Sequence, residues 1–95
     1  MSLPVSVRHN TAAHRFESAF DGHLSIAAYE KRDDLVIFSH THVPPELRGR
    51  GLAAEVVRAA LEHARAEGWR IVPACSYVAG YIARHPEFKD LIAAD

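Results

Sequence analysis

The six residues Arg48-Gly49-Arg50-Gly51-Leu52-Ala53 decide the fold of this 95-residue chain. They stand between an apolar run that begins at Leu35 and an alanine-rich run that extends to Glu67, so the sequence predicts a strand, a tight turn and a helix. The two glycines let the backbone approach a ligand without a Cβ in the way. The helix that follows directs unpaired N–H groups and its positive dipole end at the turn. This arrangement is typical of a phosphate-binding site.

Two nucleotide-binding motifs also place a glycine-rich turn between a strand and a helix, and neither of them fits this stretch. The turn does not end in Gly-Lys-Ser/Thr, as a P-loop does, and it lacks the third glycine of a dinucleotide-binding fingerprint. We therefore expect the bound anion to belong to a ligand other than a nucleoside triphosphate or a dinucleotide.

The apolar and turn-forming residues on either side predict five strands and two helices. The strands are expected at 5–9, Arg15–Phe20, His23–Tyr29, Leu35–Val43 and Trp69–Ala74, and the helices at Leu52–Glu67 and Tyr77–Arg84. The fifth strand has to run parallel to the fourth, because a helix connects the two. The prediction is one α/β (α+β) domain over residues 1–95, of order β-β-β-β-α-β-α, in which the first four strands form an antiparallel meander.

Composition and charge exclude several classes of partner. The chain is 48% hydrophobic and 24% charged, which is ordinary for a globular domain, and its net charge of −1 provides no basic field for nucleic acid or an acidic membrane. Residues 1–4 form no signal segment, and no apolar run approaches the ~20 residues that span a bilayer. We expect a cytoplasmic protein without a nucleic-acid or membrane partner; its oligomeric state is not determined by the sequence.

The turn and the motifs on either side of it resemble the minimal single-domain branch of the GNAT superfamily. The members of this superfamily are acyl-CoA-dependent N-acetyltransferases. Arg48, Gly51 and Ala53 match the Arg/Gln-x-x-Gly-x-Gly/Ala motif of that family. The resemblance continues through residues 40–87, which contain in order the motifs His-Thr-x-Val-Pro, Arg-Gly-x-Gly, Cys-x-Tyr-Val, a further Tyr and His-Pro-Glu. Compared with a full-length GNAT domain, the chain lacks the two helices after the first strand and the final two strands, so the implied fold is a truncated GNAT-like fold.

This resemblance implies that the protein binds acetyl-CoA and transfers its acetyl group to an amine. In the family, the backbone of the turn holds the pyrophosphate of coenzyme A. Pantetheine lies between the fourth and fifth strands, which splay apart, often at a β-bulge in the fourth. The pieces that build the acceptor pocket are those that the chain lacks, so the amine, a small molecule or a peptide, is not identified. The implied cofactor-binding residues are Thr41, His42, Val43, Arg48, Gly49, Arg50, Gly51, Leu52, Ala53, Tyr77 and Tyr81.

The resemblance also implies catalytic roles for Cys75 and His40, which match positions that the minimal branch is thought to use. Many GNAT enzymes protonate the leaving thiolate with a tyrosine of the last helix, but Ala83 stands at that place, and Tyr77 and Tyr81 are the nearest chemical substitutes. Cys75 immediately precedes a helix, whose N-terminal dipole is expected to lower the pKa of the thiol. His40, on the adjacent strand, is expected to act as its base or as the base for the amine. Two mechanisms stay open: an acetyl-cysteine intermediate, or direct transfer in which both residues handle protons.

Structural roles are the alternatives for these residues. Cys75 also fits a buried small hydrophobe, and His40 fits a core histidine bonded to a backbone carbonyl. His40 and His42 are expected on one strand face, but a third metal ligand is not nearby, so no metal is predicted. Other side chains are expected to be structural: Trp69, Tyr81 and Phe88 in packing, and His9, His14, His23 and His63 scattered on the surface. The alternative for the whole protein is a CoA- or acyl-CoA-binding or sensor module without turnover.

Overall fold

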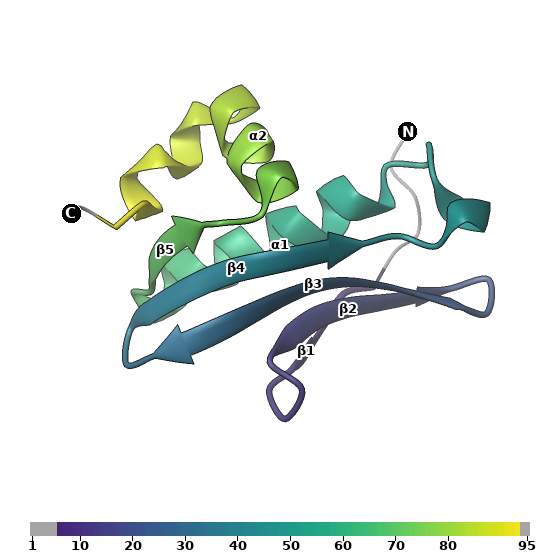
Figure 1. The fold of residues 1–95 in the computed structure, drawn as a ribbon, viewed down its shortest axis with the longest axis horizontal. Helices are drawn as coiled ribbons and strands as arrows, with labels where there is room; N and C mark the ends of the chain where they lie inside the picture. The colour runs from purple at the N-terminus through teal and green to yellow at the C-terminus, as the bar shows by residue number, and fades with distance from the viewer. Residues whose placement is uncertain (1–5, 94–95) are drawn as a thin grey trace.

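The computed structural model describes residues 6–93 and has the predicted order of strands and helices. Its strands are β1 (Arg8–Asn10), β2 (Arg15–Phe20), β3 (His23–Arg32), β4 (Leu35–His42) and β5 (Arg70–Pro73). They form one sheet in the order β1-β2-β3-β4-β5 (Figure 1). Neighbouring strands from β1 to β4 are antiparallel, whereas β5 is parallel to β4, so the predicted topology is confirmed.

Two helices and two short 3-10 segments complete the domain. Helix α1 (Leu52–Glu67) connects β4 to β5, and helix α2 (Ser76–Arg84) follows β5. The 3-10 segments η1 (Pro45–Leu47) and η2 (Pro86–Leu91) follow β4 and α2 and are not among the elements predicted from the sequence. Neither described helix is long and apolar enough to cross a membrane.

The ends of several elements differ from the sequence prediction. β1 covers Arg8–Asn10 instead of 5–9, of which residue 5 lies outside the described residues. β3 continues to Arg32, because the turn to β4 uses only two residues, of which Asp33 adopts a left-handed φ of 57°. The remaining strand and helix ends agree with the prediction to within one residue.

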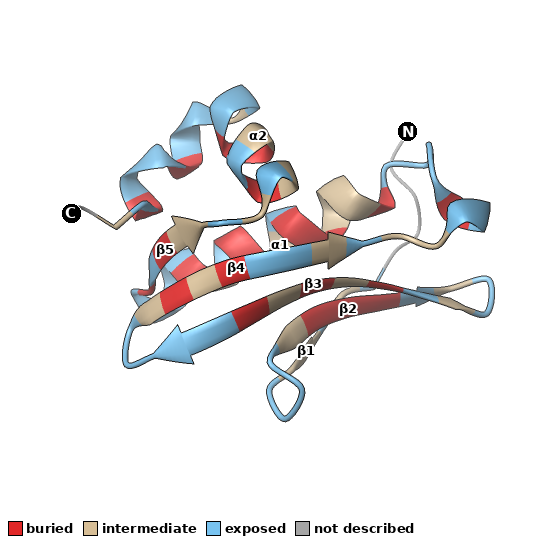
Figure 2. Cartoon of the chain, in the orientation of Figure 1, coloured by how far each residue is buried: buried red, intermediate tan, exposed pale blue. Residues whose placement is uncertain are grey.

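One hydrophobic core joins the sheet to both helices. The inward side of α1 is buried along its length, as the red segments of Figure 2 show. Helix α2 and η2 add Val78, Tyr81, Ile82, Phe88 and Leu91 to the same cluster. Trp69 also belongs to the cluster, so the packing role expected for it is correct. Because the core holds α1 against β2 and β3, it fixes where the N-terminal end of α1 lies relative to β4.

A β-bulge interrupts β4 at Ser39. Tyr29 pairs with Phe38, but the preceding residue of β3, Ala28, pairs with His40, so Ser39 is an extra residue without an opposite partner. The pairing of β5 with β4 runs from Leu35 to Phe38 and ends there. The two parallel strands therefore separate at the bulge, as the family resemblance implied.

Two histidines that were expected on the surface instead form a cluster with aromatic residues. The His9 ring stacks on Phe16 with its centroid 4.2 Å away, and its Nε2 lies 2.6 Å from the Tyr29 hydroxyl oxygen. His63 of α1 meets the His9 ring edge-on at 4.7 Å. These contacts join strands and a helix that are distant in the sequence, so local patterns could not reveal them. They attach the short edge strand β1 to the core.

Candidate functional site

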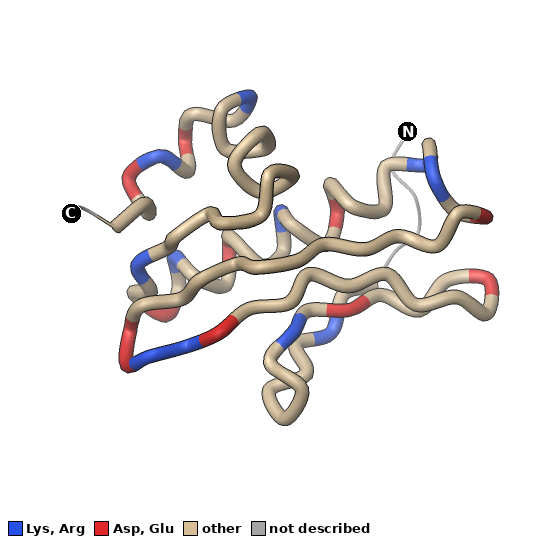
Figure 3. The backbone as a smooth tube through the Cα atoms, in the orientation of Figure 1, with Lys and Arg blue, Asp and Glu red and all other residues tan. Residues whose placement is uncertain are grey.

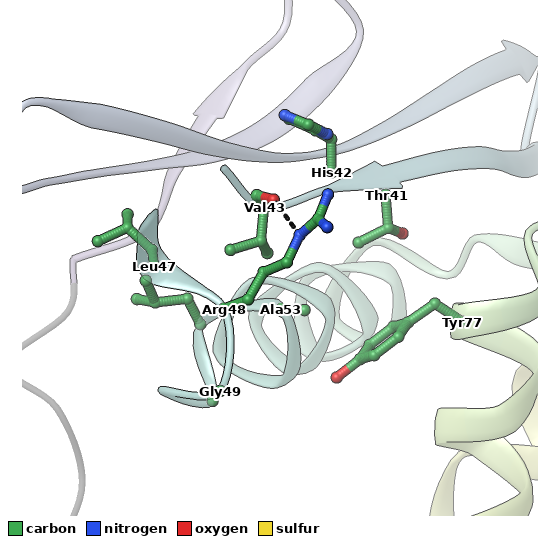
Figure 4. A pocket seen from close by; sticks show the side chains of 10 residues that line it. Thr41, His42, Val43, Leu47, Arg48, Gly49, Ala53 and Tyr77 are labelled. Carbon is green, nitrogen blue, oxygen red and sulfur yellow. Dashed lines mark hydrogen bonds between the residues drawn. The ribbon is translucent and has the colours of Figure 1, made fainter. Parts of the chain in front are cut away.

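A pocket of about 450 Å³ lies where β4 ends and α1 begins (Figure 4). This volume is within the usual range for small-molecule sites. Nine of the eleven residues predicted to bind a cofactor line it: Thr41, His42, Val43, Arg48, Gly49, Gly51, Leu52, Ala53 and Tyr77. Leu47 also lines the pocket and was missed, although an apolar residue between polar neighbours just before the glycine turn was a signal for it. The other two predicted residues, Arg50 and Tyr81, are not part of the lining.

The glycine turn has the backbone geometry of an anion-binding site. Gly49 and Gly51 adopt left-handed φ values of 84° and 77°. A Cβ at either position would meet no heavy atom within 4 Å, so the backbone conformation, and not crowding, requires glycine here. Gly51 is the N-cap of α1, and no side chain caps the helix. The first N–H groups of α1 have no acceptor within the helix, so they are available to a ligand in the pocket.

The two arginines of the turn have different positions. Arg48 and Arg50 both place a positive charge on the turn before α1 (Figure 3). Arg48 lines the pocket and donates a hydrogen bond from Nε to the Val43 carbonyl oxygen at 3.1 Å, which ties the turn to the end of β4 (Figure 4). Arg50 is exposed and lies outside the lining. Arg48 is therefore the arginine that adds positive charge to the pocket wall.

The register of β3 and β4 places Thr41 and the two histidines of β4 on opposite faces of the sheet. Thr41 pairs with Ala27, which is fully buried, whereas His40 and His42 pair with Ala28 and Ile26. Residues directly opposite each other in an antiparallel pair share a face. Thr41 therefore lies on the core side. His40 and His42 are exposed on the other face, where their rings stack 6.2 Å apart, and Figure 4 shows Thr41 and His42 pointing in opposite directions.

Cys75 lies beside this pocket, at the N-cap of α2. Its sulfur is 3.4 Å from the hydroxyl oxygen of Thr41, a residue of the pocket lining. Partial burial raises the pKa of the Cys75 thiol. The hydrogen bond with the Thr41 hydroxyl and the nearby backbone amides of Val78, Tyr77 and Thr41 lower it, and the net result is a pKa below the ordinary value. The direction agrees with the expectation from the helix N-terminus, and it favours a reactive thiolate.

His40 does not face Cys75, which corrects the arrangement expected from the sequence. Simple alternation from the buried Phe38 would turn His40 toward the core and Thr41 away from it. The extra residue at Ser39 reverses this order, so Thr41 points inward and His40 points outward. Within residues 6–93, the side-chain hydrogen-bond partner of Cys75 is Thr41 and not an imidazole.

The two tyrosines of α2 also have different environments. Tyr77 lines the pocket, whereas Tyr81 is only 3% exposed, belongs to the core and stacks on His85 at 4.1 Å. Burial raises the pKa of both phenols, so both stay protonated at neutral pH. Of the two, Tyr77 is therefore the one placed to donate a proton in the pocket. Over the part of the chain that the structure describes, no group of three or more His, Cys, Asp or Glu side chains could hold a metal ion.

Comparison with known proteins finds one family by sequence and a solved structure with the same fold. A family model described as GCN5-related N-acetyl-transferase matches residues 15–91. The chain is 31% identical over 88 residues to Protein NATD1 of Homo sapiens and of Gallus gallus, and the match covers 87% of this chain and 76% and 78% of those proteins. The solution structure of a GCN5-like protein from Staphylococcus aureus superposes with a TM-score of 0.72 at 22% identity, covering 95% of this chain and 89% of that one. The structural match shows that the two proteins share a fold.

Proposed function

Because this chain belongs to the GCN5-related N-acetyltransferase family, we propose that it transfers the acetyl group of acetyl-CoA to an amine. The observation that carries the proposal is the pocket itself. A glycine turn at a helix N-terminus lies beside the separated parallel strands, and a cysteine whose pKa is lowered contacts its wall. Bound acetyl-CoA would supply the acetyl group as a thioester.

The residues present fit the groups of this cofactor. The first amides of α1, at Leu52 and Ala53, would hold the pyrophosphate, with the charge of Arg48 nearby. The backbone of β4 around Thr41 and Val43 is not paired with β5, so it would pair with the amides of the pantetheine arm. The left-handed glycines support this assignment, since a side chain there would oppose the turn that directs these amides.

The chain offers two groups for the chemistry of transfer. Cys75 would either take the acetyl group from the thioester, which releases CoA as the leaving thiolate, or relay a proton. Its surroundings favour the thiolate that both roles need. Tyr77 would donate a proton to the leaving thiolate, because its phenol lines the pocket and remains protonated. His40 would serve only as a base for an amine that arrives from the exposed face of β4, since it points away from Cys75.

We further propose a cytoplasmic enzyme whose acceptor is a small-molecule or peptide amine, without a nucleic-acid or membrane partner. The supporting observation is the slightly acidic net charge of −1, which gives no general attraction to polyanions.

The second candidate function is a CoA- or acyl-CoA-binding module without turnover. Two observations favour it: His40 does not contact Cys75, and Ala83 stands where many members of the family have a catalytic tyrosine. One experiment separates the two functions. Purified protein is titrated with CoA by calorimetry and then assayed for CoA release from acetyl-CoA with a panel of amines and peptides. Binding with amine-dependent release supports the enzyme, binding without release supports the module, and an absence of binding contradicts both.

A further inference from the structure

We propose that Thr41, and not His40, positions and activates the Cys75 thiol, by donating its hydroxyl hydrogen bond to the thiolate. The inference deepens the proposed function and rests on it, because activation is useful only if the thiol meets an acetyl group in the pocket. Thr41 is a positioning residue in this account. Its effect on the reaction passes through Cys75.

The backbone holds the side chains of Thr41 and Cys75 together. The Cys75 N–H donates to the Phe38 carbonyl oxygen at 2.8 Å, which attaches the start of α2 to β4 just before the bulge. Thr41 lies just after the bulge and is held in register by its pairing with Ala27 of β3. Both residues are therefore fixed to the same strand, and their side chains meet at 3.4 Å.

The groups that face the Cys75 sulfur favour the thiolate. From β4 they are the hydroxyl and the backbone amide of Thr41, and from α2 they are the amides of Tyr77 and Val78. All of them are hydrogen-bond donors, and donors stabilise the thiolate over the thiol. Thr41 supplies the only side-chain donor in this set, so it is the one that a substitution can remove.

Thr41 also connects the Cys75 thiol to the pocket. Thr41 lines the pocket, and its hydroxyl touches the Cys75 sulfur. A ligand in the pocket would therefore lie on one side of Thr41 while the thiolate lies beside its hydroxyl. His40 could not take this role, since the bulge places it on the opposite face of β4.

Alkylation of Cys75 tests the proposal directly, because Cys75 is the only cysteine in the chain. The rate with iodoacetamide is measured against pH for the wild type, Thr41→Val, Thr41→Ser and His40→Gln. Valine keeps the branched shape of threonine and removes the hydroxyl, whereas serine keeps the hydroxyl. We expect Cys75 in Thr41→Val to be alkylated about tenfold more slowly at pH 7. The midpoint of its rate against pH should be about one pH unit higher, because the thiolate has lost a hydrogen bond. Thr41→Ser and His40→Gln should keep the wild-type midpoint.

An unchanged midpoint in Thr41→Val overturns the proposal, and a raised midpoint in His40→Gln would then assign the role to His40. A wild-type midpoint equal to that of a model thiol also overturns it. Far-UV circular dichroism of each variant confirms that it is folded. If the valine variant does not fold, Thr41→Ala, which also removes the hydroxyl, carries the test. The acetyl-CoA assay keeps the two questions apart. Transfer with an unshifted Thr41→Val profile retains the function and overturns the role of Thr41. A shifted profile without CoA binding retains that role in thiol activation and overturns the function.

Discussion

The backbone N–H of Cys75 donates a hydrogen bond to the carbonyl oxygen of Phe38 at 2.8 Å, at the point where β4 and β5 stop pairing. Parallel strands that separate there leave backbone groups of β4 for a ligand, and the same bond places the thiol at the opening. Because of this bond, Cys75 lies where the pairing of β4 and β5 ends, where α2 begins and beside the pocket.

Replacing Gly51 with valine should weaken the binding of CoA at least tenfold. Gly51 has a φ of 77°, which a β-branched residue resists, and the valine side chain would stand where the amides meet phosphate. Gly22 is the matched control, because it has the same φ of 77° in the β2–β3 hairpin and does not line the pocket. Each substitution should cost on the order of 1–2 kcal/mol in the free energy of unfolding. Calorimetric titration should show a loss of affinity in Gly51→Val only. Equal affinities in the two folded variants would remove the phosphate site from this turn.

Substitution of Cys75 by alanine should reduce acetyl transfer much more than it reduces CoA affinity. The thiol contacts the pocket wall but is not part of the lining, so it contributes to reaction more than to binding. Transfer rates and calorimetric affinities measured side by side give the comparison. Full activity in Cys75→Ala would leave this residue with packing alone.

Mass spectrometry after mixing with acetyl-CoA should distinguish the two open mechanisms. An acetyl group on Cys75 that an added amine discharges is the expected sign of the covalent route. Turnover without any adduct would favour direct attack. In either case, alkylation of Cys75 should be slower when CoA is bound, because cofactor and thiol share one opening.

The His9 cluster should make the protein less stable in mild acid. Burial, and then the nearby His63, lower the pKa of His9, and Glu67 offsets part of this effect. The unfolded chain therefore binds the proton more readily than the folded chain does. This contribution to stability is complete above the ordinary pKa of about 6.5 and is lost as pH falls below it. Urea unfolding of wild type and His9→Gln between pH 7.5 and 5 is the measurement. We expect the stability difference between them to shrink toward pH 5, and a constant difference would contradict the assignment.

Two glycines outside the pocket should respond to alanine in opposite directions. Gly80 lies inside α2, where a Cβ would meet only the end of the Arg84 side chain at 3.5 Å, so Gly80→Ala should stabilise the protein by about 0.5–1 kcal/mol. Gly68 caps α1 with a φ of 72°, so Gly68→Ala should destabilise it by about 1 kcal/mol. Urea denaturation of the two variants gives both values. Stabilisation by Gly68→Ala would show that residue 68 does not need a left-handed φ at the end of α1.

Much of the fold could be predicted because the signals for it are local. Residues next to one another in the chain predicted the antiparallel meander of the first four strands and the start and end of α1. The parallel arrangement of β5 followed from the length of the connection, which needs a helix. The position of the pocket followed from the same signals, since it lies where a strand ends and a helix begins.

The direction of individual side chains near the pocket could not be predicted in this way. Tyr77 and Tyr81 belong to one helix, but only packing against α1 and β4 decides that one lines the pocket and the other enters the core. The contact of His9 with Tyr29 joins β1 to a strand that is not its neighbour in the sheet, and no periodicity within the chain encodes it.

The sequence by itself determined the family, the order of strands and helices, and the glycine turn that begins α1, because each depends on residues close together in the chain. Only the tertiary structure decided which side chain meets the Cys75 thiol. A single unpaired residue at Ser39 shifts the alternation of β4 by one, so Thr41 turns inward and His40 turns outward. Whether a strand bulges depends on its pairing with β3 and on its separation from β5, and these are properties of the assembled sheet.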